Sequence, residues 1–527
     1  MKRQRIYPVG IQDFEKLRKE GAIYIDKTDL IYNLSRKYYV FLSRPRRFGK
    51  SLLSSTLKYY FQGRKDLFQG LAIEQLEKEW VQYPVLHFDL STLKNVDIQL
   101  IPSKLDGLLS NYEKIYGRNP ANITSGDRLA NLITKAHEQT GQKTVVIIDE
   151  YDAPMLDVLH DDERMAEIRR LMQEFYAPLK ACDVDLRFVF ITGITKFSQL
   201  SIFSVINNLT NVSMHPDFSA ICGITEEELY TAFEEDIEML AEEYECTPEE
   251  MRQQLKERYD GYHFSGKSAD IYNPFSLLKA FAQKELNDYW FESGTPTYLI
   301  RQMQRFQTDI LSLDNVSATS TDFDQPTEGM TDALPLLYQS GYLTIKDYNK
   351  KLNLFTLGIP NNEVRVGLTA NLLPLYTYPS TYRTSSFAMQ FHEALYYDNL
   401  EKALVAMRAY LAGIPYPEGG KEILEDMEKC EYYYETIFYL MFSFMNRHIQ
   451  TQVKTCRGRA DMVMHTAKAI YVFELKINKS AQEALEQIDE KGYMIPYTAD
   501  GRKLVKCGIS FSTQTRTIEE WIIKEEQ

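Results

Sequence analysis

The segment Ser43–Ser55, SRPRRFGKSLLSS, constrains the fold more than any other part of the sequence. It contains Gly49-Lys50-Ser51, the ending typical of a phosphate-binding loop. Residues 38–42 before it are aromatic and β-branched, as in a buried strand, and residues 51–61 after it have apolar side chains at helical spacing. A strand, a tight loop and a helix form the context in which backbone N–H groups and a helix N-terminus bind phosphate oxygens. The segment therefore predicts a nucleotide site.

Each residue of this loop would have a separate task. Lys50 would contact the β- and γ-phosphates, and the Ser51 hydroxyl would bind Mg²⁺. Arg46 and Arg47 would add positive charge close to the phosphates. However, Arg44 stands where the usual pattern has its first glycine, and Pro45 next to it lacks an amide donor. On these residues alone the loop is a working site, a degenerate one or a chance match.

A second segment supplies the acids that such a site needs. Residues 145–148, VVII, predict a parallel strand covered on both faces, and Asp149 and Glu150 follow at its carboxyl end. Asp149 would hold Mg²⁺, and Glu150 would polarise an attacking water. Residues 85–89 and 186–191 read as further buried strands. These patterns predict an α/β P-loop NTPase core with a parallel sheet. Thr192 and Thr195, after the last strand, either sense the γ-phosphate or bond to local backbone.

The first half of the chain resembles a family of bacterial AAA-like ATPases that carry RPRRFGKS as their phosphate loop. The resemblance covers roughly residues 5–290. It rests on residues 24–28 (YIDKT), 44–51 (RPRRFGKS), 148–152 (IDEYD), 203–209 (FSVINNL) and 259–262 (YDGY). It implies ATP binding, and in that family an arginine at the first-glycine position is usual. The positions that it implies for nucleotide binding are Arg46, Arg47, Phe48, Gly49, Lys50, Ser51, Leu52 and Asp149.

The middle of the chain has a different character. Residues 315–331 are rich in Ser, Thr, Asp and Pro and predict an exposed loop. Residues 333–341 predict a helix ended by a glycine, and residues 342–345 and 352–355 flank a polar turn, as in a hairpin. A helix followed by a hairpin fits a small winged-helix unit or, in the interpretation that we favour, an ATPase lid. We expect three domains: residues 1–290 as the ATPase, 291–400 as a helical connector and 401–527 as the C-terminal domain.

The C-terminal region holds a second group of acids. Asp461 lies at the start of one expected strand, and Glu474 and Lys476 end the next one, two residues apart and therefore on one face. Glu435 lies on an aromatic helix upstream. Phosphodiester hydrolysis uses carboxylates that hold Mg²⁺ and a lysine that orients the nucleophile. An exposed hairpin can carry the same residues without function, but charges that terminate a buried strand are less often incidental.

This region resembles the PD-(D/E)XK nuclease superfamily. The resemblance assigns Glu435 to the first-helix acid, Asp461 to the first motif acid, and Glu474 and Lys476 to the E-x-K motif. Ala460 replaces the usual proline before Asp461, and Gln487 and Tyr493 match two further positions. It implies an α/β restriction-endonuclease-like domain, with Asp461, Glu474 and Lys476 as catalytic residues and Glu435, Asp461 and Glu474 as metal ligands. In the ATPase half, we expect Glu150 to be the catalytic residue and Ser51 and Asp149 to be the metal ligands.

Charge and cysteine usage narrow the remaining possibilities. The net charge is −14, yet residues 1–60 hold 14 Lys and Arg against 5 Asp and Glu, while residues 226–257 are strongly acidic. Local patches, and not the total charge, therefore bear on nucleic-acid partners. The six cysteines include no C-x-x-C pair, which favours reduced thiols in the cytoplasm. No apolar run is long enough for a membrane span, and the basic N-terminus has no signal-peptide core.

Two functions from different classes fit these observations. The first is an ATP-dependent or ATP-regulated nuclease that needs Mg²⁺ and cleaves DNA or RNA. The alternative is an ATP-dependent molecular switch whose C-terminal domain binds nucleic acid or protein without cleavage, and a signalling hub is a third, weaker interpretation. An arginine finger supplied by a second copy would make the protein a homo-oligomer.

Overall fold

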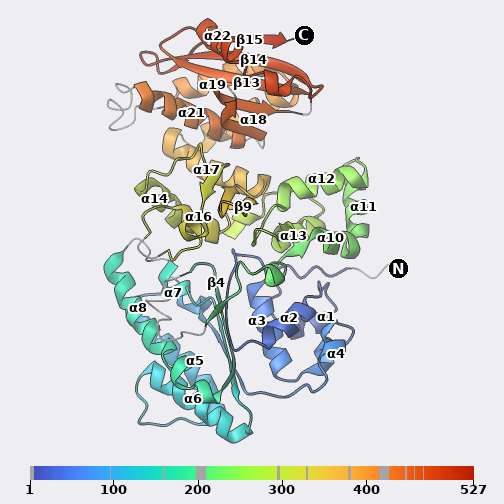
Figure 1. The fold of residues 1–527 in the computed structure, drawn as a ribbon, viewed down its shortest axis with the longest axis vertical. Helices are drawn as coiled ribbons and strands as arrows, with labels where there is room; N and C mark the ends of the chain where they lie inside the picture. Colours follow the sequence, from blue (N-terminus) through green and yellow to red (C-terminus); the bar gives the residue numbers. More distant parts are fainter. Residues whose placement is uncertain are drawn as a thin grey trace. The chain divides into compact units, whose positions relative to one another are not determined.

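The computed structural model describes residues 5–94, 96–156, 158, 161–196, 209–293, 297–327, 330–377, 381–414, 427–444, 448–455, 457–466 and 468–526. Most of the segment 203–209, used above for the resemblance, lies outside these residues. The chain divides into two compact units, one made of Met1–Thr308 and Ser317–Asn361 and the other of Asp309–Val316 and Asn362–Gln527 (Figure 1). The three-domain division expected from the sequence stays a prediction.

The first unit is built on a five-stranded parallel sheet of order β2-β3-β4-β1-β5. Its strands are β1 (Tyr39–Ser43), β2 (Val85–Asp89), β3 (Thr144–Asp149), β4 (Leu186–Gly193) and β5 (Thr210–Asn211). Every residue of β1 and β3 is buried, as expected for strands with both faces covered. The predicted α/β core with a parallel sheet is confirmed. Because all strands run the same way, the loop after β1 and the acids after β3 lie at one edge of the sheet, with the end of β4 between them.

Helices cover both faces of this sheet (Figure 1). On one face α3 (Lys50–Phe61) packs against β2, β3 and β4, with the rings of Phe61 and Phe188 in contact. On the other face α5 (Ile101–Tyr116), α6 (Ser125–Thr140) and α8 (Asp162–Tyr176) join the strands in one apolar cluster. The shorter helices are α1 (Phe14–Glu20), α2 (Thr28–Ser35), α4 (Ile73–Leu76), α7 (Ala153–Leu156) and α9 (Pro178–Ala181).

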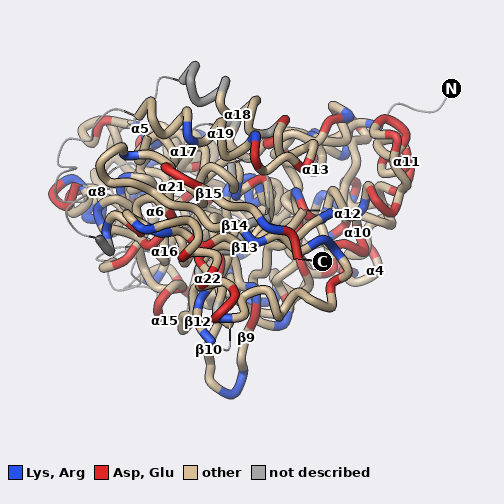
Figure 2. Tube along the Cα trace, turned by 90° about the horizontal axis from the view of Figure 1, so that it is seen from above, with Lys and Arg blue, Asp and Glu red and all other residues tan. Residues whose placement is uncertain are grey.

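A helical subregion follows the sheet. It consists of β6 (Ile224–Thr225), α10 (Glu226–Ala232), α11 (Glu234–Glu243), α12 (Pro248–Tyr259), β7 (Ile271–Tyr272) and α13 (Pro274–Gln283). Capping boxes at Thr225 and Thr247 begin α10 and α12, and the apolar faces of the helices share one core. This subregion contains the acidic segment noted in the sequence, and Figure 2 shows Asp and Glu residues in red along α11.

The segment from 297 to 361 contains α14 (Thr297–Arg305), β8 (Val316–Ala318), α15 (Ser320–Phe323), α16 (Leu334–Gln339), β9 (Thr344–Asn349) and β10 (Leu354–Gly358). The predicted helix and hairpin are present. The prediction of an exposed loop over 315–331 is wrong for Val316–Ala318 and Ser320–Phe323, which form β8 and α15, and Thr319 and Asp322 form the capping box that begins α15. Phe323 at its end is fully buried between the rings of Tyr338 and Phe355.

The second unit contains helices and a mixed sheet of order β11-β12-β13-β14-β15. Only the β13–β14 pair is parallel, and the other neighbours are antiparallel. Rings from α21 pack on this sheet, where Phe438 and Phe442 contact Phe473 of β13. The elements are α17 (Asn362–Thr377), α18 (Thr381–Tyr396), α19 (Leu400–Ala412), α21 (Met427–Phe444), β11 (His448–Thr455), β12 (Gly458–His465), β13 (Ala469–Ile477), α22 (Ala481–Lys491), β14 (Lys503–Ser512) and β15 (Thr517–Glu526).

Gly508 of β14 allows α22 to lie close to the sheet. A Cβ at this position would stand 2.3 Å from the carbonyl oxygen of Ala481, at the start of α22. We therefore expect Gly508→Ala to destabilise the second unit by about 3 kcal/mol, since the helix must move or the strand must bend. Thermal unfolding followed by circular dichroism measures this change.

Gly107→Ala is the matched control. Gly107 lies within α5, and a Cβ there has nothing within 4 Å. Alanine favours the helix by up to about 1 kcal/mol, so this variant should melt at the same or a higher temperature. Equal melting temperatures for Gly508→Ala and the unchanged protein would contradict the proposed close packing.

Candidate nucleotide and metal sites

The loop after β1 leads into α3 through a left-handed residue. Gly49 has φ 88° and ψ 21° and is the N-cap of α3, which begins at Lys50. Such a conformation favours glycine, and a Cβ there has nothing within 4 Å. The first N–H groups of a helix have no partner within the helix. The geometry therefore fits a loop that presents backbone N–H groups to an anion.

Lys50 is buried and folds back over its own loop. Its Nζ donates to the carbonyl oxygens of Arg44 and Pro45, both at 3.0 Å. Burial lowers the pKa of its ammonium group, whereas the charges of Glu150, Asp149 and Asp152 act in the opposite direction. The lysine thus lies among three carboxylates at the edge of the sheet.

Arg44 explains how the loop tolerates an arginine in place of the first glycine. Its side chain is 1% exposed and points away from the loop interior. The guanidinium donates to the carbonyl oxygens of Ser43, Ser213 and Phe218 at 2.9, 2.7 and 3.1 Å, and lies 4.1 Å from the ring centroid of Phe264. Burial lowers its pKa to about 10. Arg44 therefore ties the phosphate loop to the segment after β5.

Two residues that were predicted to contact the nucleotide, Arg47 and Phe48, have side chains that pack against other parts of the first unit. Arg47 has φ 68°, and its guanidinium donates to the carbonyl oxygen of Tyr289 and lies 3.9 Å from the ring centroid of Phe275. The expectation that its side chain adds charge beside the phosphates stays a prediction, and in this structure the side chain is engaged elsewhere. The ring of Phe48 is buried against Tyr262.

Arg46 and Leu52 lie closer to the expected ligand. The charge of Arg46 acts on the Glu150 carboxylate, which places it on the side of the acids. Leu52 and Gly49 line a cavity of about 100 Å³ whose other walls are mostly apolar, among them Ile25 and Leu278. An apolar cavity beside a phosphate loop can accept a flat base.

The acids after β3 are held in a buried cluster. Asp149 is 2% exposed, and burial raises its pKa to about 6 against the opposing effects of a Ser51 hydrogen bond and the Lys50 charge. Glu150 follows with φ 49°, which is uncommon outside glycine and turns its carboxylate out of the strand direction. Burial raises the pKa of Glu150 as well. Ser51, Lys50, Asp149 and Glu150 are thus brought together as expected for a nucleotide and Mg²⁺.

Two further acids in this cluster had no role in the sequence interpretation. Asp89 ends β2 directly beside Asp149 in the sheet register. Asp152 is buried and accepts from the N–H groups of Ile194 and Thr195 at 2.9 and 2.7 Å. The position of Asp89 at the end of a parallel strand was the signal that could have identified it.

The two threonines after β4 bond to local groups. Thr192 Oγ1 donates to the carbonyl oxygen of Leu42 at 2.7 Å, and Thr195 Oγ1 donates to Asp152 at 2.8 Å. Of the two interpretations, this arrangement favours structural hydroxyls over a γ-phosphate sensor.

The C-terminal acids lie on two neighbouring strands. The β12–β13 register pairs Met462 with Phe473, so Asp461 and Glu474 lie side by side. The sequence predicts Asp461 at the start of a strand, whereas in the structure it is the fourth residue of β12. Its Oδ2 accepts the N–H of Leu475 at 2.7 Å. The hairpin therefore brings the predicted acids together.

Glu474 is held by two donors on one oxygen. Its Oε1 accepts from Lys476 Nζ at 3.0 Å and from Gln487 Nε2 of α22. Its Oε2 is buried and has no hydrogen-bond partner in the part of the chain that the structure describes. Burial raises the pKa of both Glu474 and Asp461, and the two carboxylates repel each other. Lys476 opposes this, since its charge favours the ionised forms.

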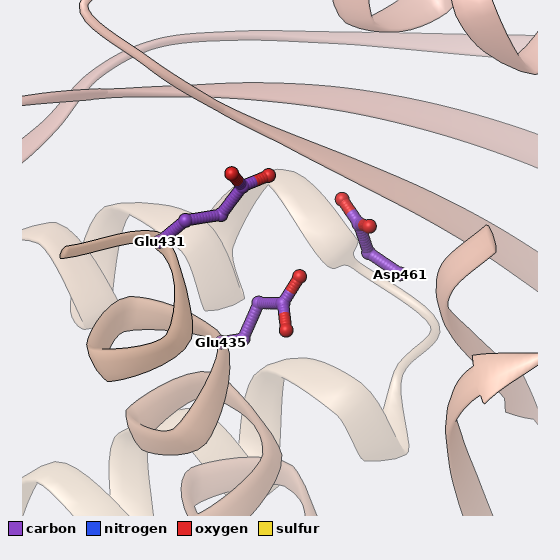
Figure 3. A group of neighbouring side chains, drawn as sticks. All are labelled: Glu431, Glu435 and Asp461. Atoms are coloured by element: carbon purple, nitrogen blue, oxygen red, sulfur yellow. The ribbon is translucent and has the colours of Figure 1, made fainter. Parts of the chain in front are cut away.

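Two glutamates of α21 complete the group. One carboxylate oxygen each of Glu431, Glu435 and Asp461 lies within 4.8 Å of the others, and Figure 3 shows the three side chains converging. Glu435 was predicted, but Glu431 was not. The two are four residues apart and therefore share a helix face, which was the available signal. Converging carboxylate oxygens are the ligands that Mg²⁺ and Ca²⁺ prefer, so the residues fit a divalent cation.

The fold and the two sites are those of an AAA-ATPase-like P-loop domain and a nuclease-like domain in one chain. Residues 8–203 match the model of a predicted AAA-ATPase family, and residues 429–521 match that of the PD-(D/E)XK nuclease superfamily. The chain is 32% identical over 530 residues to an uncharacterized protein from the vnfD 5′ region of Azotobacter chroococcum mcd 1, with 99% of each chain covered. It belongs to the family of that protein.

A solved structure was also found. It is a signal transduction ATPase with numerous domains, with a tetratricopeptide repeat sensor, from Pyrococcus horikoshii. It is 14% identical to this chain, with a TM-score of 0.25, and the match covers 80% of this chain and 66% of that one. A likeness this low adds nothing to the argument. None of the helices in the described ranges has the length and apolar character needed to cross a membrane.

Asp149 should make the stability of the first unit depend on pH. Its pKa is 3.8 ordinarily and about 6 when buried, so between these values the folded protein binds more protons than the unfolded chain. Stability therefore falls as the pH rises from about 4 to about 6. Asp149→Asn removes this contribution. The free energy of unfolding of the variant minus that of the unchanged protein should therefore rise by up to about 3 kcal/mol as the pH rises across this range.

Urea unfolding of the nucleotide-free protein, followed by tryptophan fluorescence at several pH values, measures the difference. Asp162→Asn, at an exposed position of α8, is the matched control. If the difference in free energy of unfolding between Asp149→Asn and the unchanged protein is constant between pH 4 and pH 7, the Asp149 carboxyl does not titrate in this range and the prediction is wrong.

Proposed function

We propose that the protein binds and hydrolyses ATP and that its C-terminal domain is a metal-dependent nuclease that cleaves phosphodiesters of DNA or RNA. The observation that carries the nuclease half is the position of Asp461, which lies beside Glu474 in the sheet register and has a carboxylate oxygen within 4.8 Å of one of Glu435, while Lys476 bonds to Glu474. The family match to the PD-(D/E)XK superfamily supports the same reaction.

In the ATPase half, each residue has a task that its position allows. The N–H groups at the start of α3 and the Lys50 ammonium would bind the β- and γ-phosphates. Ser51 and Asp149, which hydrogen-bond to each other, would hold Mg²⁺. When bound, this ion would neutralise phosphate charge. Glu150 would accept a proton from the attacking water. Lys50 must leave the carbonyl oxygens of Arg44 and Pro45 to reach the nucleotide.

In the nuclease half, Asp461, Glu474 and Glu435 would hold a divalent cation. When bound, this cation would activate a water and stabilise the leaving oxygen. Lys476 is 15% exposed at the side chain and hydrogen-bonds to Glu474, so it can reach both the acids and a substrate. Its ammonium would orient the attacking water or neutralise the charge that develops on the phosphate. Gln487 would keep Glu474 in place through its hydrogen bond to Oε1.

We also infer a cytoplasmic protein. Cys182, Cys222, Cys246, Cys430 and Cys507 carry free thiols, which agrees with a reducing compartment. Magnesium is the expected metal at both sites, because all the candidate ligands are oxygen atoms.

Lys476→Ala should lose cleavage while ATP hydrolysis is kept. We expect at least a 100-fold fall in cleavage rate, roughly the effect of removing one charge-stabilising donor. The assay uses single- and double-stranded DNA and RNA with Mg²⁺ or Mn²⁺, with and without ATP. Lys468→Ala, at an exposed position of the β12–β13 turn, is the matched control and should cleave normally.

Lys50→Ala in the same assay tests the ATPase half. It should abolish ATP hydrolysis, and its cleavage rate with and without ATP reports whether nucleotide regulates the nuclease. If the intact protein hydrolyses ATP but cleaves none of the substrates with either metal, the nuclease proposal falls and the switch without cleavage replaces it.

Arg459 should contribute to nucleic-acid binding. It lies on β12 two residues before Asp461, hence on the same face, and it is exposed. Its charge acts on the Asp461 carboxylate. If it contacts a phosphate, Arg459→Ala should reduce the slope of log affinity against log salt by about 1. Fluorescence anisotropy with labelled DNA and RNA at several salt concentrations measures this slope, with Lys468→Ala as control. An unchanged slope would remove Arg459 from the interface.

A further inference from the structure

The hairpin of β9 and β10 carries lysines that no acid pairs with. Lys350 and Lys351 lie in the turn between the two strands, where every residue is exposed, and Lys267 is exposed as well. Figure 2 shows blue at this turn. Within the ranges that the structure describes, none of these three ammonium groups has a hydrogen-bond or ion-pair partner. By contrast, Lys256 and Lys402, which also lie at the surface, pair with glutamates at 2.9 and 3.1 Å. The three unpaired lysines are called the hairpin patch below.

The neighbouring charges offset one another and not the hairpin patch. Lys346 and Asp347 are adjacent in β9 and have opposite charges. Asp270, in the same loop as Lys267, pairs with Nδ1 of His263 at 2.9 Å. The hairpin patch therefore keeps its positive charge, although the net charge of the whole chain is −14. A local surface of this sign attracts a polyanion.

Side-chain hydrogen bonds hold the turn in one conformation. Oδ1 of Asn349, the last residue of β9, accepts the N–H groups of Lys351 and Leu352 at 3.1 and 3.3 Å. Asn353 has φ 51°, and its Oδ1 accepts from the hydroxyl of Tyr348 at 3.0 Å. The backbone that carries the two turn lysines is thus fixed before any ligand binds. A ligand then orders only the lysine side chains, which lowers the entropy cost of binding.

The loop that carries Lys267 is fixed to the same hairpin. A Cβ at Gly266 would stand 2.7 Å from Cδ1 of Tyr348, so the backbone next to Lys267 lies directly on that ring. At the start of β9, Thr344 Oγ1 accepts the N–H of His263 at 2.8 Å and donates to its carbonyl oxygen at 3.2 Å. The three lysines of the hairpin patch are therefore presented by one connected support within the first unit.

The shape of this element fits one class of polyanion. The major groove of B-DNA is about 12 Å wide and admits a two-stranded β-ribbon, whereas the major groove of an RNA duplex is too narrow for side chains to read. Lysine binds phosphate as a flexible point charge, and each contact releases counter-ions from the duplex. A β-hairpin with lysines at its turn is therefore suited to double-stranded DNA.

We propose that the hairpin patch binds phosphates of double-stranded DNA, with the turn between β9 and β10 at the major groove. As a statement about the substrate, the proposal rests on the function proposed above and deepens it by naming duplex DNA. The C-terminal acids would cleave the DNA, and the hairpin patch would add affinity from the first unit.

The test measures binding of the full-length, nucleotide-free protein to a labelled DNA duplex by fluorescence anisotropy, at salt concentrations from about 0.05 to 0.2 M. EDTA is present, so that a metal-dependent nuclease does not cleave the duplex. The double variant Lys350→Ala/Lys351→Ala removes two of the proposed phosphate contacts. We expect the slope of log affinity against log salt to become smaller by about 2, and the affinity at the lower salt concentrations to fall by about 10-fold or more. Lys267→Ala should reduce the slope by about 1.

Two further variants and one further duplex make the test specific. Lys65→Ala/Lys143→Ala removes the same charge at exposed positions after the end of α3 and before the start of β3, away from the phosphate loop, and should leave the slope unchanged. Lys350→Arg/Lys351→Arg retains both charges and should keep the slope of the unchanged protein. On an RNA duplex of equal length, Lys350→Ala/Lys351→Ala should reduce the slope by less than on DNA. Circular dichroism confirms that each variant is folded.

The outcomes separate this proposal from the nuclease proposal. An unchanged slope in Lys350→Ala/Lys351→Ala, or an equal reduction in Lys65→Ala/Lys143→Ala, overturns the hairpin patch as a DNA-binding surface. An equal reduction on duplex RNA overturns its assignment to the DNA major groove. In each of these cases, cleavage that depends on Lys476 would leave the nuclease proposal standing. A slope that falls as expected in a protein that cleaves no substrate would support the hairpin patch and overturn the nuclease proposal.

Discussion

The burial of carboxylates at the ends of strands governs both sites of this protein. Asp149 is the last residue of β3 and Glu474 lies near the end of β13, and burial raises the pKa of each. In each site one lysine, Lys50 or Lys476, supplies the nearest opposing charge. An arginine also acts on each site, Arg46 on Glu150 and Arg459 on Asp461, but the carboxylates still outnumber these cations. Each site can therefore accept further positive charge. A divalent cation is the ligand that this arrangement suits.

The phosphate loop shows how a substituted residue can preserve a site. Arg44 occupies the position of a glycine, yet its side chain leaves the loop and bonds to the carbonyl groups of Ser213 and Phe218. The loop is thereby anchored from outside, and its interior stays open for Lys50. Because Lys50 bonds to two loop carbonyls, the proposed nucleotide binding would exchange those contacts for phosphate oxygens. In that case the lysine side chain would be the part of the loop that moves.

Sequence reasoning reached the features that depend on local pattern. Buried strands, the loop-to-helix turn and the pair Glu474 and Lys476 follow from runs and spacings of residues, and the structure contains them. It failed where the answer depends on distant partners. Arg47 points to Tyr289, which is 242 residues away in the chain. Phe323 is buried by rings that only the fold brings together. Glu431 was missed because the aromatic residues of α21 dominate its pattern.

Two glycines connect the fold of the C-terminal domain to its chemistry. A Cβ at Gly508 would meet the carbonyl oxygen of Ala481 at 2.3 Å, and one at Gly458 would meet the hydroxyl of Tyr493 at 2.9 Å. Both ends of the α22 region can therefore approach the sheet closely. Gln487, between them, then reaches Oε1 of Glu474. With Oε1 occupied by Gln487 and Lys476, Oε2 is the oxygen that would remain for the proposed metal. Gly508 pairs with Glu474 in the sheet register, so the close packing of α22 next to the acids is what brings Gln487 to Glu474.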